Sequence, residues 1–169
     1  MQYTSYYSSP LGNILLAADE IGLTGLWFEG QKYFALRLDK EHEEREILIL
    51  NTAKRWLDEY FPGKEPDSSV PLHLTGTDFQ KDVWEILGTI PYGHTMTYGK
   101  IAKCIAEKRE VSHMSAQAVG GAVGHNPVSV IVPCHRVVGA NGSLTGYAGG
   151  IDRKEKLLAL EKAGMKVQV

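Results

Sequence analysis

The chain has 169 residues, of which 43% are hydrophobic, and a formal net charge of −2. It is long enough to bury a core without disulfide or metal staples, and the near-neutral charge excludes a globally basic, histone-like binder of nucleic acid. No apolar run is long enough to cross a bilayer, and no residues show paired metal-ligand spacing, so neither a membrane nor a metal is expected.

The cysteine count and the N-terminus indicate the compartment. Cys104 and Cys134 are too few for a disulfide framework or an all-cysteine zinc site, which suggests a reducing compartment in which both thiols stay free. The N-terminal segment MQYTSYYSSP lacks the basic stretch and apolar run of a targeting signal. We therefore expect a cytoplasmic protein, or a nuclear one in a eukaryote.

Charge is divided unevenly along the chain. Residues 1–95 carry 8 Lys and Arg against 15 Asp and Glu, whereas residues 96–169 carry 10 against 5. The two parts thus have net charges of −7 and +5. This asymmetry is expected if only the second part meets a polyanion; binding of a nucleic acid would then lie beyond about Pro91 and weaken as salt rises.

Three β-rich runs separated by turn residues open the chain, which predicts an antiparallel meander. They span Gln2 to Ser8, Asn13 to Ala18 and Leu23 to Phe28. The charged stretch from Asp39 to Glu46 is expected to be a solvated loop or a helix face. A helix is predicted around Thr52 to Phe61, where apolar residues share one face and Pro62-Gly63 ends the pattern.

Residues 63–71, GKEPDSSVP, have linker composition and give the one plausible domain boundary. We therefore predict an N-terminal supporting domain of residues 1–75 and a C-terminal domain of residues 76–169. The second domain begins with its own helix, because Thr77 and Gln80 make a capping box ahead of an apolar stripe.

Three further helices are predicted in the second domain. TMTYGKIAKCIA indicates a helix capped by Thr95 or Thr97, and SHMSAQAVGGAVGHN indicates a helix of small side chains, so that the pair resembles a helix-turn-helix. Asp152 and Glu155 form a second capping box, at the start of a last helix that reaches Gly164. The predicted fold is therefore α+β, with an antiparallel sheet and a helix first and a helical domain second.

The motif Pro133-Cys134-His135-Arg136 follows the apolar run Val128 to Val132, which we expect to be a short buried strand that ends at the proline. A thiol at a strand end can be held rigidly and still face a cleft. The neighbouring histidine is the commonest side chain for stabilising a thiolate near neutral pH. The alternative is that Cys134 is only a small buried side chain, since free cysteine is among the most buried residue types.

Other segments could contribute to the same site. The helix of small residues at 116–124 could let another backbone, such as that of DNA, approach closely, although tight packing against a neighbouring helix would explain it equally well. The glycine-rich loop Gly139 to Gly150 surrounds Tyr147 and could wall a pocket. Glu161 could orient His135, although a glutamate near a helix end is most often solvated surface.

The segment IVPCHRVVGANGSLTGYAGG, preceded by AVGGAVGHNP and TMTYGKIA, closely resembles the O(6)-alkylguanine-DNA alkyltransferases, the methylated-DNA-protein-cysteine methyltransferases. The likeness is strong from about Phe79 to Gly164, whereas the first seventy residues match only in general layout. It implies a ribonuclease H-like N-terminal domain and a winged-helix-like C-terminal domain that carries the active-site cysteine.

The function implied by the resemblance is direct DNA repair. A damaged nucleotide is flipped out of double-stranded DNA, and its alkyl group moves stoichiometrically and irreversibly from O(6) of guanine to Cys134. Whether O(4) of alkylated thymine is also a substrate stays open. The resemblance implies no cofactor, and we expect a monomer whose partner is duplex DNA containing alkylated guanine.

The resemblance also assigns roles to individual residues. His135 would activate Cys134 through a bound water, Glu161 would orient His135, and Asn126 would brace the active-site turn. Tyr98 would help to turn the nucleotide out and would donate its hydroxyl to the guanine ring. The helix of small residues would lie in the minor groove. The main chain near Cys134, Val137 and Ala148 would read the edge of the flipped base. The implied contacts to DNA and to the flipped base are Ala116, Gln117, Gly120, Gly121, Arg136, Val137, Tyr147 and Ala148.

Two positions depart from the family pattern. Many members have an arginine in the recognition helix that fills the gap left by the extruded base, whereas this chain has Gln117. Glutamine fills space and forms hydrogen bonds but brings no charge, so we predict weaker or more context-dependent flipping. Ala148 stands where some members have serine, so that only a backbone amide is left to contact the guanine oxygen.

Two other classes fit parts of the sequence. A non-catalytic alkylated-DNA binder or helix-turn-helix regulator would share the fold, but relatives of that type lack the acceptor cysteine. A cysteine hydrolase would use Cys134 and His135, but neighbours on a strand point to opposite faces, so a turn would have to redirect one of them. Cys104 lies on the inward face of a predicted helix, and we assign it no role.

Overall fold

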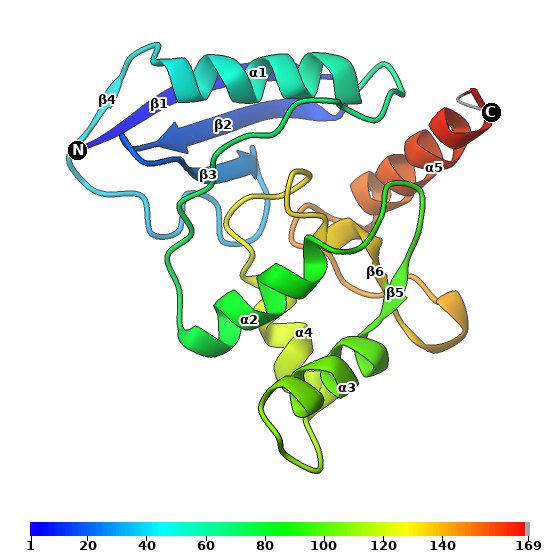
Figure 1. The fold of residues 1–169 in the computed structure, drawn as a ribbon. Coiled ribbons are helices and arrows are strands. Elements are labelled where there is room, and N and C mark those ends of the chain that lie inside the picture. Colours follow the sequence, from blue (N-terminus) through cyan, green and yellow to red (C-terminus); the bar gives the residue numbers. More distant parts are fainter. Residues whose placement is uncertain (168–169) are drawn as a thin grey trace.

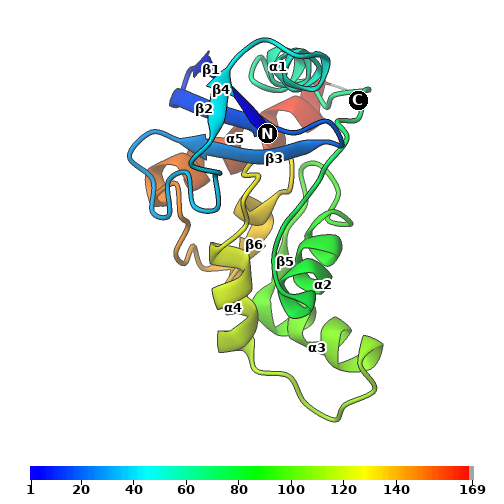
Figure 2. The same ribbon diagram turned by 90° about the vertical axis from the view of Figure 1, so that its left-hand side faces the viewer.

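The structure is a computed structural model that describes residues 1–167. It is built in two tiers, which Figure 1 and Figure 2 show from two sides. The first tier is a four-stranded sheet with α1 (Leu48–Tyr60) lying on it. The second tier holds three helices, α2 (Asp78–Leu87), α3 (Tyr98–Lys108) and α4 (Ala116–Gly124). The last helix, α5 (Ile151–Val167), lies at the level of the sheet in both views, and the whole is the predicted α+β fold.

The sheet has the strand order β3-β2-β1-β4. Its first three strands, β1 (Gln2–Ser9), β2 (Gly12–Ala18) and β3 (Leu23–Phe28), pair antiparallel, which confirms the predicted meander. The fourth strand, β4 (His42–Glu44), pairs in parallel with β1 and lies in the charged stretch predicted to be a loop or a helix face. The prediction therefore missed a short edge strand, whose exposed charged residues discourage pairing with other chains.

Two predicted helix caps are confirmed. Thr77 and Gln80 form the capping box at the start of α2, and the Thr97 hydroxyl accepts a hydrogen bond from Lys100 N at 3.1 Å at the start of α3. The first helix, α1, begins at Leu48, earlier than predicted, and includes the fully buried Leu50 in its first turn. Its end at Tyr60 agrees with the predicted stop before Pro62.

The capping box predicted at Asp152 is wrong, because α5 begins at Ile151. Its first turn closes by a hydrogen bond from Lys154 N to Gly150 O at 3.1 Å. Gly150 has a φ of +94°, a left-handed conformation that glycine adopts without strain. The glycine therefore sets the start of the helix, and Asp152 lies in the first turn, where its charge interacts favourably with the helix dipole. The helix also continues past Gly164.

The apolar run Val128 to Val132 is largely buried, but it is not the predicted strand. Val128 forms an isolated bridge with Leu26, and Val130 has a φ of 70°. The turn follows from Asn126, whose side chain accepts a hydrogen bond from Val128 N at 3.0 Å and donates one to Val132 O at 2.8 Å. These bonds occupy backbone groups that a neighbouring strand would need.

The larger apolar cluster runs through both tiers. Backbone hydrogen bonds also join them, from Leu26 N to Pro127 O at 2.8 Å and from Ser129 N to Leu26 O at 3.2 Å. Within the second tier, the indole N–H of Trp84 on α2 donates to Ala122 O on α4 at 2.9 Å. The segment that follows α4 is therefore held by the sheet of the first tier and, through α4, by α2 of the second tier.

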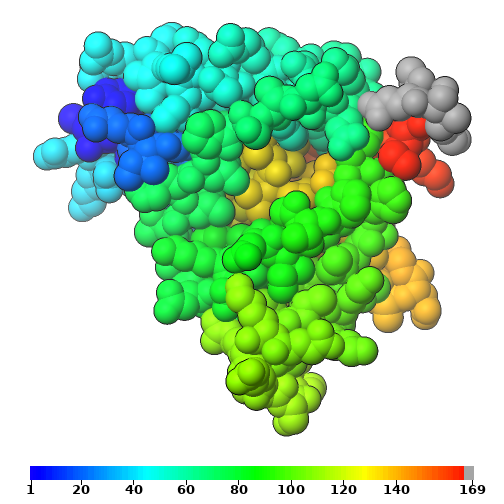
Figure 3. Space-filling model, viewed as in Figure 1, coloured from blue at the N-terminus to red at the C-terminus, as the bar shows by residue number. Residues whose placement is uncertain are grey.

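Two short strands complete the second tier. β5 (Met96–Thr97) precedes α3 and pairs in parallel with β6 (Val137–Val138). The turn between α3 and α4 forms the tip of the molecule farthest from α1 (Figure 3). Within residues 1–167, no helix is long and apolar enough to cross a membrane, and no three His, Cys, Asp or Glu side chains are grouped to hold a metal ion.

Candidate active site

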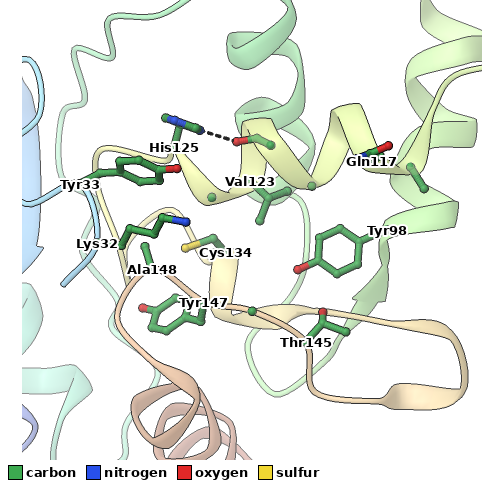
Figure 4. Close-up of a pocket in the computed structure, with 15 residues that line it drawn as sticks. Lys32, Tyr33, Tyr98, Gln117, Val123, His125, Cys134, Thr145, Tyr147 and Ala148 are labelled. Carbon is green, nitrogen blue, oxygen red and sulfur yellow. Dashed lines mark hydrogen bonds between the residues drawn. The ribbon is translucent and has the colours of Figure 1, made fainter.

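Cys134 is the first residue of η1 (Cys134–Arg136), a 3-10 helix that starts directly after Pro133. The residue is 4% exposed and lies in the wall of a pocket of about 650 Å³. Figure 4 shows its sulfur directed into the space between α4 and the loop that carries Tyr147. The predicted site residues that line this pocket are Tyr98, Ala116, Gln117, Gly120, Gly121, Cys134, Tyr147 and Ala148.

The environment of Cys134 keeps its thiol protonated. Burial raises the pKa of the thiol above its ordinary value of 9.0. Hydrogen bonding to Asn126 and the nearby charge of Lys154 oppose this rise in the pKa but do not cancel it. Because the thiolate is the nucleophile, the proton has to leave before or during any reaction of this sulfur.

His135 and Glu161 are buried behind the pocket wall, at 0% and 1% exposure. Nε2 of His135 lies 2.5 Å from Oε2 of Glu161, so the structure brings together the two residues that the sequence pairs. The hydroxyl of Tyr60, on α1, donates to the same carboxylate oxygen at 2.6 Å. Gly93 N donates to the other oxygen at 3.0 Å. The carboxylate therefore holds the imidazole and is itself fixed by both tiers.

The pKa values of this pair indicate which nitrogen of His135 carries a proton. Burial alone would raise the pKa of Glu161, but the hydrogen bonds and charges of His135 and Arg136 outweigh it and lower the pKa to about 2. Burial lowers the pKa of His135, and Glu161 offsets only part of this effect. An ionised carboxylate can only accept, so Nε2 of the neutral imidazole donates to it.

The second ring nitrogen of His135 is then free to act as a base. Nδ1 is buried and has no hydrogen-bond partner among residues 1–167. A neutral imidazole with a proton on Nε2 has a lone pair on Nδ1, which can accept a proton. The neighbour in the chain, Cys134, is the residue whose proton has to be removed.

Besides His135 and Glu161, three predicted site residues lie outside the pocket lining of the described chain. Arg136 is 8% exposed, and its guanidinium donates to Glu161 Oε1 at 2.8 Å and to Ile90 O at 2.7 Å. Val137 is fully buried in β6. The ion pair with Glu161 holds the guanidinium of Arg136 inside the protein, whereas the contact implied for Val137 is made by its main chain, which a buried side chain leaves possible. Both contacts stay predictions. Asn126 is buried as well, where it fixes the turn before Cys134.

The face of α4 in the pocket carries almost no side-chain bulk. Outside its own helix, a Cβ added at Gly121 or Gly124 would meet no atom within 4 Å. One added at Gly120 would meet only the Tyr98 ring, at 3.9 Å. Packing inside the protein therefore does not require glycine at these positions, and a face kept open for an external backbone explains them better.

Sequence reasoning missed residues that reach the site from elsewhere. Lys32 and Tyr33 line the pocket although they belong to the first tier, and nothing in their local sequence marks them. Lys154 is fully buried, and its ammonium donates to the carbonyl of Thr145 in the pocket loop at 3.2 Å. The helical spacing offers one signal for Lys154, since it shares a face of α5 with Glu161.

The fold and the site together define a class of protein. In this class a buried cysteine faces a pocket, and two helices arranged like a helix-turn-helix lie beside that pocket. Two family models cover most of the chain. Residues 78–163 match 6-O-methylguanine DNA methyltransferase, DNA binding domain, and residues 2–74 match 6-O-methylguanine DNA methyltransferase, ribonuclease-like domain.

Relatives of known name match over nearly the whole chain. The methylated-DNA–protein-cysteine methyltransferase of Methanosarcina acetivorans is 48% identical over 160 residues, which cover 94% of this chain and 97% of that protein. The corresponding protein of Mycobacterium tuberculosis is 46% identical over 155 residues, covering 92% and 89%. A crystal structure of the M. tuberculosis protein, OGT, in complex with DNA has a TM-score of 0.80 at 44% identity and covers 96% of this chain and 93% of that chain.

The chain belongs to the 6-O-methylguanine DNA methyltransferase family. This finding confirms the resemblance drawn from the cysteine motif and its neighbours. It also confirms the ribonuclease-like N-terminal part, which the sequence suggested only in general layout.

Proposed function

We propose that this chain repairs duplex DNA by moving an alkyl group, such as methyl, from O(6) of guanine onto Cys134. The thioether that forms is too stable for water to cleave, so the protein is consumed and one molecule repairs one lesion. Membership of the family and the names of the relatives support this function.

The position of Cys134 is the observation that carries the proposal. Its thiol reaches a pocket of about 650 Å³ that is lined on one side by α4. That volume lies within the range of about 300–1,000 Å³ typical of small-molecule sites. A base inside a duplex cannot bring its O(6) to a recessed sulfur, so the damaged nucleotide has to be turned out of the stack to react.

The transfer of the alkyl group needs no cofactor, because the two reactants supply all of its atoms and electrons. The sulfur forms a bond to the alkyl carbon while the bond between that carbon and O(6) breaks, and the electron pair of the broken bond stays on guanine. The thiol proton leaves through Nδ1 of His135, by way of a water, and guanine takes up a proton as it regains its normal form. Because burial raises the pKa of Cys134, the proton is removed as part of the reaction.

The other residues of the site support this step. Glu161 is a positioning residue, because it fixes the tautomer and orientation of His135. Tyr98, at the start of α3 and in the pocket lining, donates its hydroxyl to the guanine ring as negative charge develops there. Tyr147 and Ala148 flank the flipped base. The main chain near Cys134, Val137 and Ala148 reads the edge of the base, and the side chains of Arg136 and Asn126 hold the site together from behind.

DNA is bound by the second half of the chain. The exposed face of α4 enters the minor groove, and its missing side-chain bulk lets the DNA backbone approach. Gln117 fills the gap that the extruded base leaves. The net charge of +5 on residues 96–169 supports this assignment, since a polyanion attracts the positive part of the protein.

The organisation of the chain completes the proposal. Residues 1–75 form a supporting domain and residues 76–169 form the domain that binds DNA and accepts the alkyl group. The protein acts as a monomer, in the cytoplasm or in the nucleus of a eukaryote. The linker composition of residues 63–71 supports the boundary, and the two free cysteines suit a reducing compartment.

The proposal is tested by intact mass. The protein is incubated with a duplex that contains one O(6)-methylguanine, and the adduct is mapped by digestion. We expect the mass of one methyl group on the peptide that holds Cys134, none on the peptide that holds Cys104, and none in Cys134→Ala.

The rival classes give different results in the same experiment. A lesion binder would retain the duplex without a change in protein mass, and a hydrolase would turn over an ester or amide repeatedly. Either outcome would contradict the proposed function.

A further inference from the structure

One side of the pocket is built by the N-terminal half. Lys32 and Tyr33 follow β3 and line the pocket together with residues that all come after β5 in the chain. In Figure 4 they lie on the side of Cys134 that faces away from Tyr98 and Gln117. If the flipped base enters past Tyr98 and Gln117, these two residues lie on the opposite side of the site from the base.

Specific contacts hold this segment against the pocket. Lys32 N donates to Ala148 O at 2.9 Å, which joins the segment to the loop beside the flipped base. The ring of Tyr33 stacks on His125 at the end of α4, with centroids 4.2 Å apart and planes 24° apart. The Lys32 ammonium lies 5.2 Å from the centroid of the same ring. Buried Gln31 braces the turn, because its amide accepts from Phe28 N at 2.8 Å and donates to Lys32 O at 3.1 Å.

The contacts of this segment hold its backbone in a conformation that its residues rarely adopt. Tyr33, Ala35 and Arg37 have φ values of 61°, 55° and 70°. Residues other than glycine rarely adopt this left-handed region, and they persist there when surrounding contacts determine the conformation. The position of the Tyr33 ring is therefore fixed by the fold rather than by local preference.

We infer that Tyr33, held by Lys32 and His125, limits the size of the alkyl group that Cys134 can accept. This inference rests on the proposed function and names the substrate range of the same site. The N-terminal half then contributes to specificity as well as to support.

The geometry of the displacement gives the reason. Sulfur, the attacked carbon and the leaving O(6) lie in one line, so the rest of a longer alkyl chain must extend sideways from that line. A methyl group has no such extension. A butyl chain needs space beside the attacked carbon, and on the side away from the base the pocket is lined by Tyr33 and Lys32.

The test compares two lesions in matched duplexes, O(6)-methylguanine and O(6)-butylguanine, and measures the ratio of their transfer rates to Cys134 by intact mass. We expect Tyr33→Gly to raise the butyl-to-methyl ratio about tenfold, since relief of an overpacked site changes the barrier by an amount of this order. Glycine suits the left-handed backbone at this position, so the change removes the ring without adding strain. A second variant, Tyr33→Trp, should lower the ratio.

The matched control is Phe34→Ala. Phe34 is the next residue of the same segment, is 39% exposed, and contacts Trp27 on the side of the sheet without lining the pocket of the described chain. Its ratio should equal that of the unmodified protein. The inference is overturned if the ratio in Tyr33→Gly stays within twofold of the control or falls. Failure of the unmodified protein to accept methyl would instead overturn the proposed function.

Discussion

Glu161 is the residue on which the buried polar contacts of the site converge. Its carboxylate accepts hydrogen bonds from His135, Tyr60, Arg136 and the backbone of Gly93. Those donors come from α1, from the turn before β5 and from η1, so a single side chain joins both tiers to the active site. The same contacts keep the carboxylate ionised and leave Nδ1 of His135 as the basic nitrogen.

The low pKa of Glu161 predicts an acid-sensitive fold. The folded-state pKa of about 2 lies below the ordinary value of 4.5, so the stabilisation is complete above pH 4.5 and is lost as the pH falls toward 2. Between pH 6 and pH 3 this one group should account for a loss of about 2 kcal/mol in the free energy of unfolding. Urea unfolding at both pH values measures the loss.

Glu161→Gln provides the comparison for this prediction. The variant should lose less than the unmodified protein over the same pH range, because it has no carboxyl group to titrate. The difference stays below about 2 kcal/mol, since the loss of Glu161 also lowers the pKa of the buried His135. Equal losses in the two proteins would show that Glu161 is not the group responsible. The other carboxylates with lowered pKa values, Asp19, Glu46 and Asp82, contribute equally to both proteins and cancel in the difference.

For single residues, the sequence predicts those that belong to a recognisable motif. It misses those that reach the site only because the folded chain packs them there. Cys134 and His135 stand out by their neighbours in the chain, and Glu161 follows from the family pattern. Tyr60 and Lys32 reach the site from the other tier, so no local signal marks them. The buried partner of Arg136 is likewise invisible in the local sequence, since Glu161 lies on a distant helix.

Among the helices and strands, α4 is the one whose small-residue composition can be tested for its function by a single substitution. Gly121→Ala should raise the free energy of unfolding by up to about 1 kcal/mol, because alanine favours a helix and the added Cβ meets no atom of the protein outside that helix. The same methyl group would stand between α4 and the DNA backbone. We therefore expect the affinity for duplex DNA to fall by about tenfold, or roughly 1.4 kcal/mol.

Both quantities are measured on one variant, by urea unfolding and by fluorescence anisotropy at a fixed salt concentration. A protein that is more stable and yet binds DNA less tightly would assign the glycine to the interface. Unchanged affinity would mean that the DNA backbone does not approach this face of α4.

The other elements show where local sequence decides structure. The start of α2 is predictable, because the capping box of Thr77 and Gln80 lies within a few residues of the helix that it begins. The run Val128 to Val132 has strand composition, but Asn126 binds its backbone and turns it. The start of α5 is set by the conformation of Gly150, which a capping-box pattern at Asp152 conceals.

For the whole molecule, the two tiers act as one unit around the pocket. Arg153, near the start of α5, donates to Leu11 O at 2.9 Å in the first tier and to Gly149 O at 3.0 Å in the pocket loop. Its guanidinium also lies 4.7 Å from the centroid of the Phe28 ring. The first tier therefore fixes the loop beside Tyr147, and the shape of the pocket depends on both halves of the chain.

The central claim for the molecule is that each copy accepts one alkyl group and keeps it. A titration tests this claim, with a fixed amount of protein, a large excess of duplex containing O(6)-methylguanine, and a count of the guanines restored over time. We predict a plateau at one restored guanine for each protein molecule, unchanged by longer incubation. Continued repair beyond that plateau would contradict the account.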